Sequence, residues 1–513
     1  MNDRNLWRRG LFALALGAGL ALVGCNEQAS ETAANLPTPA TQTVATPAES
    51  GQAIAREAEA EQKRIQSLDE LGDQPLARRQ LDIQSWQTEG GARVLFVEAH
   101  ELPMFDLRLT FAAGSSQDNG VPGLAMLTNA MLNEGIAGRD VTAIASGFES
   151  LGAEFGNGSY RDMAIASLRS LSAADKREPA LQLFNEVVGR PTFPEDSLQR
   201  IKNQVMAGFE YQKQNPGKLA SLELFAQLYQ NHPYAHPSEG TAESIPGITV
   251  DQLRAFHAKA YAAGNVVIAL VGDLSREEAE AIAGEVSAAL PQGGALPPPP
   301  APQEPAAVHE HIDFPSNQTH LMLAQLGVAR GDPDYAALYL GNQVLGGGGF
   351  GTRLMEEVRE KRGLTYGVYS GFSPMQTVGP FMINLQTRAE LSEATLALVQ
   401  KLVADFVEQG PTKAELERSK REIAGSFPLS TASNSDIVGQ LGSIGFYNLP
   451  LTYLEDFMQQ VQALSVEEVK AAMSKHLDAG GFVIVSAGPE VEQKPLPAPS
   501  ETPIEQPSGV PEH

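Results

Sequence analysis

The 513-residue sequence is poor in cysteine, in basic residues and in long apolar runs. Its single cysteine, Cys25, excludes an internal disulfide, so no covalent cross-link within the chain stabilises the fold. The sequence contains only 37 Lys and Arg residues but 62 Asp and Glu residues, so the formal net charge at pH 7 is −25. This charge argues against nucleic acid as a partner and against electrostatic adhesion to anionic lipid headgroups.

The longest apolar run near the N-terminus covers residues 11–24 and is too short to span a bilayer comfortably as a helix. Arginines precede it at positions 4, 8 and 9, and the small-residue segment Leu22-Val23-Gly24 leads directly into Cys25. This arrangement resembles a bacterial lipoprotein signal, which implies a signal peptide over residues 1–25 and lipidation of Cys25. The alternative is a cleaved secretory signal with an incidental cysteine.

The residue after Cys25 bears on the compartment. In lipoproteins an Asp at this position commonly retains the protein at the inner membrane, so Asn26 favours the outer membrane. Acyl chains would hold the protein firmly, because each buried methylene contributes about 0.8 kcal/mol. We therefore expect a lipid-anchored, periplasm-facing protein of the bacterial cell envelope that contacts the membrane through the lipid anchor only.

Composition divides the rest of the chain into segments. Residues 26–60 and 491–513 are rich in Pro, Glu and other polar residues, which predicts a disordered tether and a disordered tail. The proline-rich run at 293–307 predicts a semi-rigid linker. The remaining length exceeds what one core usually serves, so we expect two domains, at residues 75–292 and 308–490.

The two halves resemble each other in sequence. Residues 248–273 align without a gap on residues 464–489, and each copy reads as a Thr or Ser cap, an amphipathic helix, a glycine and an apolar strand. A second match pairs residues 198–202 with 416–420. A repeat of about 200 residues indicates a duplicated domain.

Strands and helices are mixed within each half, which predicts an α+β fold with sheets covered by helices. The expected strands are Leu107–Ala113, Ala164–Leu171, His320–Leu326 and Met382–Leu385, and the expected helices include Leu181–Val188 and Glu393–Val407.

Residues 123–135, GLAMLTNAMLNEG, resemble the zinc helix of the M16 (pitrilysin-like, inverted-zincin) peptidases, G-L-A-H-x-x-E-H-M-L-x-x-G. In that pattern two His one turn apart bind zinc and the Glu activates the bound water. Here Met126, Asn129 and Ala130 replace them, so the resemblance implies a degenerate metal site. The alternative is an ordinary buried helix with Leu124, Leu127 and Met131 facing inward.

No other ligand set restores a metal centre. Glu210 lies a few positions away from the place of the family's third ligand, and one carboxylate does not make a zinc site. His232 and His236 are each followed by proline, which disfavours a helix with both rings on one face. His309 and His311 have no obvious third ligand. We expect that this chain binds no metal or other cofactor.

The segment 345–370 carries the second strong motif. The run Gly346, Gly347, Gly348 and Gly349 lacks the Gly-Lys-Ser/Thr of a P-loop and resembles the M16 glycine-rich loop, followed by R-E-K-R-G-L-T-Y. The resemblance implies that Arg359 grips substrate and that Tyr366 supports the transition state, with the glycine run as a possible substrate loop. The plainer alternative is a surface Arg on a helix and a Tyr on a strand.

The M16 resemblance covers both halves and implies two homologous domains, each a mostly antiparallel sheet covered by helices, facing each other across a cavity. It also implies a function. The chain would be a non-catalytic subunit, inactive alone, that pairs with an M16 subunit bearing zinc on an intact H-x-x-E-H and supplies Arg359 and Tyr366 for proteolysis of peptides or unfolded proteins. The alternative is an inert peptide-binding or scaffold protein. An active peptidase with another metal site is disfavoured, because no adequate ligand set is found.

Overall fold

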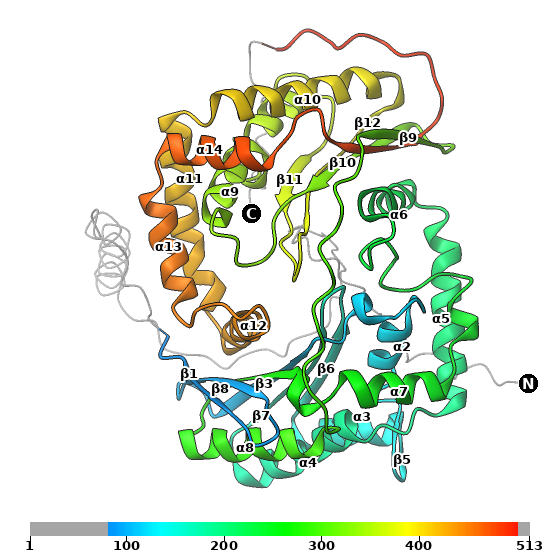
Figure 1. Cartoon of the computed structure of the whole chain (residues 1–513), viewed down its shortest axis with the longest axis vertical. Helices are drawn as coiled ribbons and strands as arrows, with labels where there is room; N and C mark the ends of the chain where they lie inside the picture. Colours follow the sequence, from blue (N-terminus) through cyan, green and yellow to red (C-terminus); the bar gives the residue numbers. More distant parts are fainter. Residues whose placement is uncertain (1–80, 501–513) are drawn as a thin grey trace, which may run out of the picture. The chain divides into compact units, whose positions relative to one another are not determined.

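The computed structural model describes residues 81–500 (Figure 1). The predicted signal peptide with Cys25, the predicted tether and residues 501–513 of the predicted tail lie outside the described residues. None of the described helices is long and apolar enough to cross a membrane.

The N-terminal half contains a six-stranded sheet in the order β1-β2-β8-β3-β7-β6. Strands β2 and β8 are parallel and every other neighbouring pair is antiparallel. The strands are β1 (Gln84–Gln87), β2 (Arg93–Glu98), β3 (Met104–Phe111), β6 (Glu154–Ser159), β7 (Ala164–Leu171) and β8 (Val266–Gly272), and a small hairpin joins β4 (Gly135–Ile136) to β5 (Arg139–Asp140).

The C-terminal half contains a five-stranded sheet in the order β11-β12-β10-β13-β9. Its strands are β9 (Val308–Asp313), β10 (Gln318–Leu326), β11 (Val368–Phe372), β12 (Pro380–Arg388) and β13 (Val483–Gly488). The single parallel pair, β9 with β13, occupies the place of β2 with β8, and the other pairs follow in the same antiparallel order. The two sheets therefore confirm the predicted duplication and the α+β fold.

Helices cover these sheets (Figure 1). In the N-terminal half they are α2 (Leu124–Ala130), α3 (Val141–Leu151), α4 (Ala174–Gly189), α5 (Glu195–Gln212), α6 (Pro216–Tyr229), α7 (Val250–Ala260) and α8 (Arg276–Ala289). In the C-terminal half they are α9 (Tyr335–Asn342), α10 (Ser392–Gln409), α11 (Lys413–Ser426), α12 (Asn434–Phe446), α13 (Tyr453–Ala463) and α14 (Val466–His476), with the π-helical segments η4 (Gln343–Gly347) and η5 (Met355–Glu360).

The aligned sequence segments form equivalent structures. Helices α7 and α14 both begin with a capping box, in which Thr249 pairs with Gln252 and Ser465 pairs with Glu468. Such a box satisfies two backbone N–H groups that the first helical turn leaves free. Each helix leads into an inner strand of its sheet, β8 or β13, in the helix–strand order that the repeat predicts.

A buried lysine stands at the same place in both halves. Lys202 on α5 donates to the carbonyl oxygens of Pro246 (3.1 Å) and Ile248, just before α7. Lys420 on α11 donates to the carbonyl oxygen of Gln462 (2.9 Å), just before α14. Both lysines are less than a tenth exposed, and carbonyl oxygens replace the water that a buried ammonium loses.

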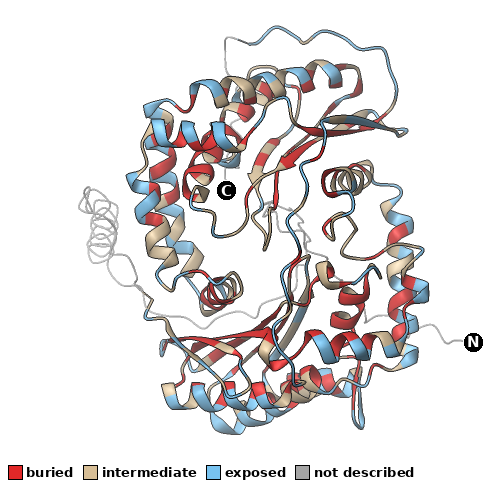
Figure 2. Cartoon of the chain, in the orientation of Figure 1, coloured by how far each residue is buried: buried red, intermediate tan, exposed pale blue. Residues whose placement is uncertain are grey.

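Each sheet is covered on one face by a helix from the other half of the chain. Helix α12 packs on β8, β3 and β2, and α6 packs on β13 and β10 (Figure 1). Strands β8 and β13 are consequently buried along their whole length. Figure 2 shows that buried residues gather on the strands of the sheets. The sequence pattern predicted sheets covered by helices and did not predict this exchange between the halves.

Two segments without helix or strand lie against the domains. In the linker, Gly293 accepts a hydrogen bond from the amide of Gly264 (3.0 Å) and Leu296 donates to Asn265 Oδ1 (2.8 Å). Residues 491–500 of the predicted tail are also held. The amide of Lys494 donates to the carbonyl oxygen of Glu390 (2.7 Å), and Leu496 packs against the C-terminal core. This part of the tail is therefore more ordered than the sequence predicted.

Candidate functional site

Helix α2, which carries the degenerate metal site, begins at a buried carboxylate. Asp118 accepts hydrogen bonds from the amides of Gly123 (2.8 Å) and Ala125 (2.7 Å), and it is 1% exposed. Burial raises the pKa of this carboxyl to about 7, although the two amides oppose the shift. Gly123 has φ 92°, and a Cβ there would lie 2.6 Å from the side chain of Ile245. The start of α2 thus keeps a specific geometry without its metal ligands.

The three replaced positions are absorbed into the packing of the N-terminal domain. Asn129, at the place of the general base, is 3% exposed, and its Nδ2 donates to the Ile165 carbonyl oxygen and to Tyr261 Oη, both at 3.1 Å. Met126 and Ala130, at the places of the two His, are partly buried against the apolar core. Asn129 is neutral and cannot take a proton from water, so this helix does not support metallopeptidase chemistry.

The inward face of α2 is apolar. Leu124, Leu127 and Met131 are all buried, as the reading of this segment as an ordinary packed helix requires. The structure therefore agrees with both sequence interpretations. The helix of the family pattern is present, and the residues at its metal-site positions pack within the domain.

We expect Asn129→Ala to lower the free energy of unfolding by about 2 kcal/mol, because it removes two buried hydrogen bonds and leaves Tyr261 without its amide partner. Urea unfolding of the purified protein measures the change. Asn203→Ala on the exposed face of α5 is the control, with an expected change within about 0.5 kcal/mol. Equal effects of the two variants would contradict a structural role for Asn129.

Metal-type ligands do not converge near α2. Within residues 81–500, the one group of three such side chains close enough to share an ion is Asp332, Asp334 and His476, in the C-terminal half. Asp334 already binds Lys475 (2.6 Å) and His476 (2.9 Å). Glu210, considered above for the third ligand, is mostly exposed and pairs with Lys213 at 2.6 Å. The residues in the family's ligand region thus do not fit a zinc ion.

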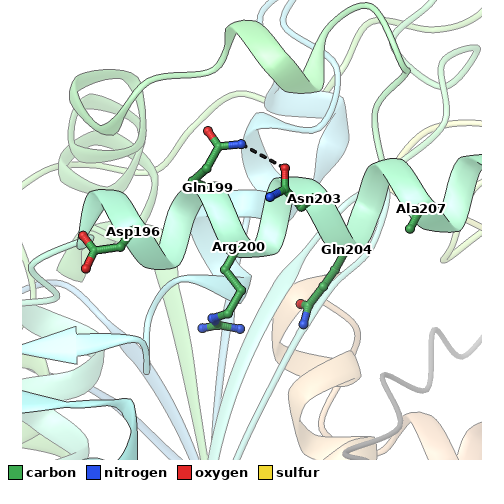
Figure 3. A pocket seen from close by; sticks show the side chains of 6 residues that line it. All are labelled: Asp196, Gln199, Arg200, Asn203, Gln204 and Ala207. Atoms are coloured by element: carbon green, nitrogen blue, oxygen red, sulfur yellow. Dashed lines mark hydrogen bonds between the residues drawn. The ribbon is translucent and has the colours of Figure 1, made fainter.

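An open depression of about 600 Å³ lies along the surface of helix α5 (Figure 3). It is lined by Asp196, Gln199, Arg200, Asn203, Gln204 and Ala207. Arg200 pairs with Glu134, which follows α2, and Gln199 donates to Asn203 Oδ1 at 2.9 Å. Asp196 is the only carboxylate of the lining, so the depression has no set of metal ligands.

The histidine pairs have other partners. His232 lies in a turn, where its Nε2 contacts the Pro300 carbonyl oxygen at 2.7 Å, and burial lowers its pKa. His236 has its Nδ1 3.2 Å from the carbonyl oxygen of Pro237. His309 and His311 on β9 both contact Ser486 Oγ, at 3.1 and 2.9 Å. Each pair therefore has a local structural role, in line with the non-metal interpretation.

The glycine-rich loop packs closely on β11. A Cβ at Gly346 would lie 2.5 Å from Ser370 Oγ, and one at Gly347 would lie 2.3 Å from Asn342 Nδ2. Asn342 and Ser370 are joined by two hydrogen bonds, of 3.0 and 2.6 Å. Gly348 and Gly349 continue the loop, and Gly349 has φ 74°. Gly346 and Gly347 thus allow the loop to pack closely against Ser370 and Asn342. A direct contact with substrate would involve the exposed part of the loop.

Arg359 differs from the basic residues beside it. Lys361 pairs with Glu356 (2.9 Å) and Glu357 (2.6 Å), and Arg362 pairs with Glu357 (2.6 Å). Among the described residues no carboxylate forms an ion pair with Arg359. Its guanidinium carbon lies 4.7 Å from the ring centroid of Phe350, an aromatic residue that the sequence analysis did not single out. Its N–H groups are therefore available to an external acceptor.

Tyr366 is the most exposed large side chain of this segment. It is 80% exposed and lies in a turn between buried Leu364 and Val368. Thr365 shapes the turn, since its Oγ1 donates to the Gly367 carbonyl oxygen (2.8 Å) and accepts from the Gly367 amide (3.1 Å). Within residues 81–500, the guanidinium of Arg359 and the hydroxyl of Tyr366 thus both remain without an ion pair.

Two homologous α+β domains, the first with a helix in which Met126, Asn129 and Ala130 stand at the zinc-site positions, define a metallopeptidase-like protein. Residues 93–242 match the insulinase family model (peptidase family M16), and residues 247–423 match the model of the peptidase M16 inactive domain. The chain belongs to the M16 family and is a non-peptidase member of it.

Individual relatives agree with this assignment. The non-peptidase homologue YmxG of Helicobacter pylori is 31% identical over 408 residues, which cover 77% of this chain and 91% of the relative. A crystal structure of a peptidase M16 inactive domain from Pseudomonas fluorescens is 73% identical, with a TM-score of 0.80, and covers 81% of this chain and 100% of that one. A protease structure from Helicobacter pylori has the same fold at 19% identity, with a TM-score of 0.74, and covers 80% of this chain and 100% of that one.

Proposed function

We propose that this chain is the non-catalytic, lipid-anchored subunit of a two-chain M16 peptidase. A partner subunit with an intact H-x-x-E-H holds the zinc and the general base. This chain adds Arg359 and Tyr366 to the same site and binds the peptide or unfolded protein that the partner cleaves. The lipoprotein-like signal supports a site at the periplasmic face of the outer membrane.

The observation that carries the proposal is the contrast between the two halves. In the N-terminal half, Asn129 is buried and bonded within the domain. In the C-terminal half, Arg359 has no carboxylate partner among residues 81–500, and Tyr366 is 80% exposed. A guanidinium can hold a peptide carbonyl or carboxylate in a fixed fork, and a phenol can donate to a developing oxyanion. These groups suit a site completed by another chain.

A reconstitution experiment tests the proposal. The purified chain alone should contain no stoichiometric zinc, measured by elemental analysis, and should not cleave an unfolded-protein substrate. Mixing it with an H-x-x-E-H subunit from the same organism should give a stable complex whose peptidase rate exceeds that of the partner alone. Stoichiometric zinc together with cleavage by the lone chain would overturn the proposal.

The second candidate function is that of an inert peptide-binding or scaffold protein. It is favoured by the packing of α2, because Met126 and Ala130, at the positions of the two His ligands, pack against the apolar core. Complex formation without any gain in the partner's peptidase rate would favour this candidate.

A further inference from the structure

Phe350 is a large apolar side chain held at the surface by a closed turn. It is 60% exposed and stands between two glycines with positive φ, Gly349 at 74° and Gly351 at 81°. Thr352 Oγ1 donates to the Gly349 carbonyl oxygen at 2.9 Å, and Arg418 Nη2 donates to the Gly351 carbonyl oxygen at 2.7 Å. Both sides of Phe350 are thus fixed, so its exposure is built into the loop.

The Phe350 ring contacts the guanidinium group of Arg359. The guanidinium carbon of Arg359 lies 4.7 Å from the Phe350 centroid, within the range of a cation–π interaction. A carboxylate partner would accept hydrogen bonds from the guanidinium N–H groups, whereas an aromatic ring offers no oxygen acceptor. The carboxylates of Glu356 and Glu357 are bound by Lys361 and Arg362, as described above.

We infer that Phe350 is the positioning residue for Arg359, holding the guanidinium over its ring so that N–H groups of Arg359 meet a planar oxygen acceptor of a bound peptide. The inference rests on the proposed function and assigns a role to a residue outside the Arg359–Tyr366 pair. A free arginine side chain loses rotamer entropy when it is ordered on binding. The ring orders Arg359 before the peptide arrives, which favours binding.

The start of the glycine-rich loop is joined to the strand that follows the Tyr366 turn. Asn342, at the root of the glycine-rich loop, is bonded to Ser370 on β11, the strand that the Tyr366 turn enters. Gly346 leaves no room for a side chain between them. The loop that carries Phe350 is therefore joined at its start to β11, the strand that follows the Tyr366 turn.

The experiment measures steady-state kinetics of the reconstituted two-chain peptidase on a peptide substrate. Phe350→Leu should raise KM about 2- to 5-fold with kcat unchanged, the range expected for a cation–π contact at an exposed site. Phe350→Trp, whose ring binds cations best, should keep KM at or below the wild-type value. Replacing Phe350 with 4-fluoro- and then 3,4,5-trifluorophenylalanine keeps the shape, withdraws charge from the ring face and should raise KM in steps.

A double-variant cycle identifies the partner of the ring. In an Arg359→Ala background, Phe350→Leu should change KM no further. Equal KM effects of Phe350→Leu in both backgrounds, or a KM indifferent to fluorination, would overturn the inference. The thermal midpoint of Phe350→Leu should equal that of the wild type, because the ring is exposed, and a large drop would instead indicate a role in folding.

The outcomes separate this inference from the proposed function. If Arg359→Ala raises KM while every Phe350 variant behaves as wild type, the role of Phe350 fails and the shared site stands. If Arg359→Ala changes neither KM nor kcat in an intact complex, the shared site fails and the role of Phe350 fails with it.

Discussion

Tyr366→Phe is expected to lower kcat of the reconstituted peptidase about 100-fold, because it removes a donor to the oxyanion that forms when water attacks the peptide carbonyl. Arg359→Ala is expected to act mainly on KM, since a guanidinium that grips the substrate contributes before the chemical step as well as during it. Both side chains leave their polar groups free of ion pairs in the described structure, so neither substitution removes an internal contact of that kind. Steady-state kinetics of the complex separates the two effects.

Two surface residues serve as matched controls for these variants. Tyr211→Phe removes the hydroxyl of a tyrosine that is 75% exposed on α5, and Arg421→Ala removes an exposed arginine on α11. Both are expected to leave kcat and KM within about 2-fold of wild type, because surface changes away from a site cost little. A complex that assembles and cleaves normally with Tyr366→Phe and Arg359→Ala would refute the shared site.

Gly445→Ala is expected to destabilise the protein by about 3 kcal/mol, because α12 leaves no room for a methyl group where it crosses the N-terminal sheet. A Cβ at Gly445 would lie 2.3 Å from Val267 Cγ1 and 3.0 Å from Leu95 Cδ1, both in a buried cluster. Overpacking of this kind typically costs 1–3 kcal/mol, and both contacts lie on a sheet that resists displacement. Chemical denaturation measures the change.

The same helix provides the control. Gly439 lies six residues earlier on α12, where a Cβ would meet nothing closer than an Arg108 nitrogen at 4.0 Å. Gly439→Ala should stabilise the protein by up to about 1 kcal/mol, since alanine has the higher helix propensity. The expected effects of the two substitutions thus have opposite signs, and a stabilising Gly445→Ala would show that α12 does not pack on the sheet as described.

The pattern of the sequence predicted the elements well where the information was local. The strand expected at Ala164–Leu171 is β7 with the same bounds, and the helix expected at Glu393–Val407 lies within α10. The Thr249 and Ser465 caps follow from residue types three positions apart. The replacement of the metal ligands is likewise visible at Met126, Asn129 and Ala130 without any coordinates.

The exchange of covering helices had a signal in the sequence that was not used. The β8 segment VVIALVG is apolar without alternation, which is typical of a strand buried on both faces. This pattern predicts that a further element packs on the second face of the strand, but it does not identify that element. The choice of α12 depends on how residues of the two halves meet across the sheet, and no periodicity within either half contains that information.

Arg359 shows the same division between sequence and tertiary structure. The sequence by itself determined a duplicated α+β chain with a degenerate zinc helix and an R-E-K-R-G-L-T-Y segment in its second half. It placed Glu356, Glu357 and Glu360 close enough along the chain for any of them to pair with Arg359. Only the tertiary structure decided that Lys361 and Arg362 pair with the first two of these carboxylates and that the Arg359 guanidinium lies over the Phe350 ring. The physical reason is that ion pairing depends on the paths of the π-helical turn and the glycine loop, which set side-chain directions that spacing alone does not.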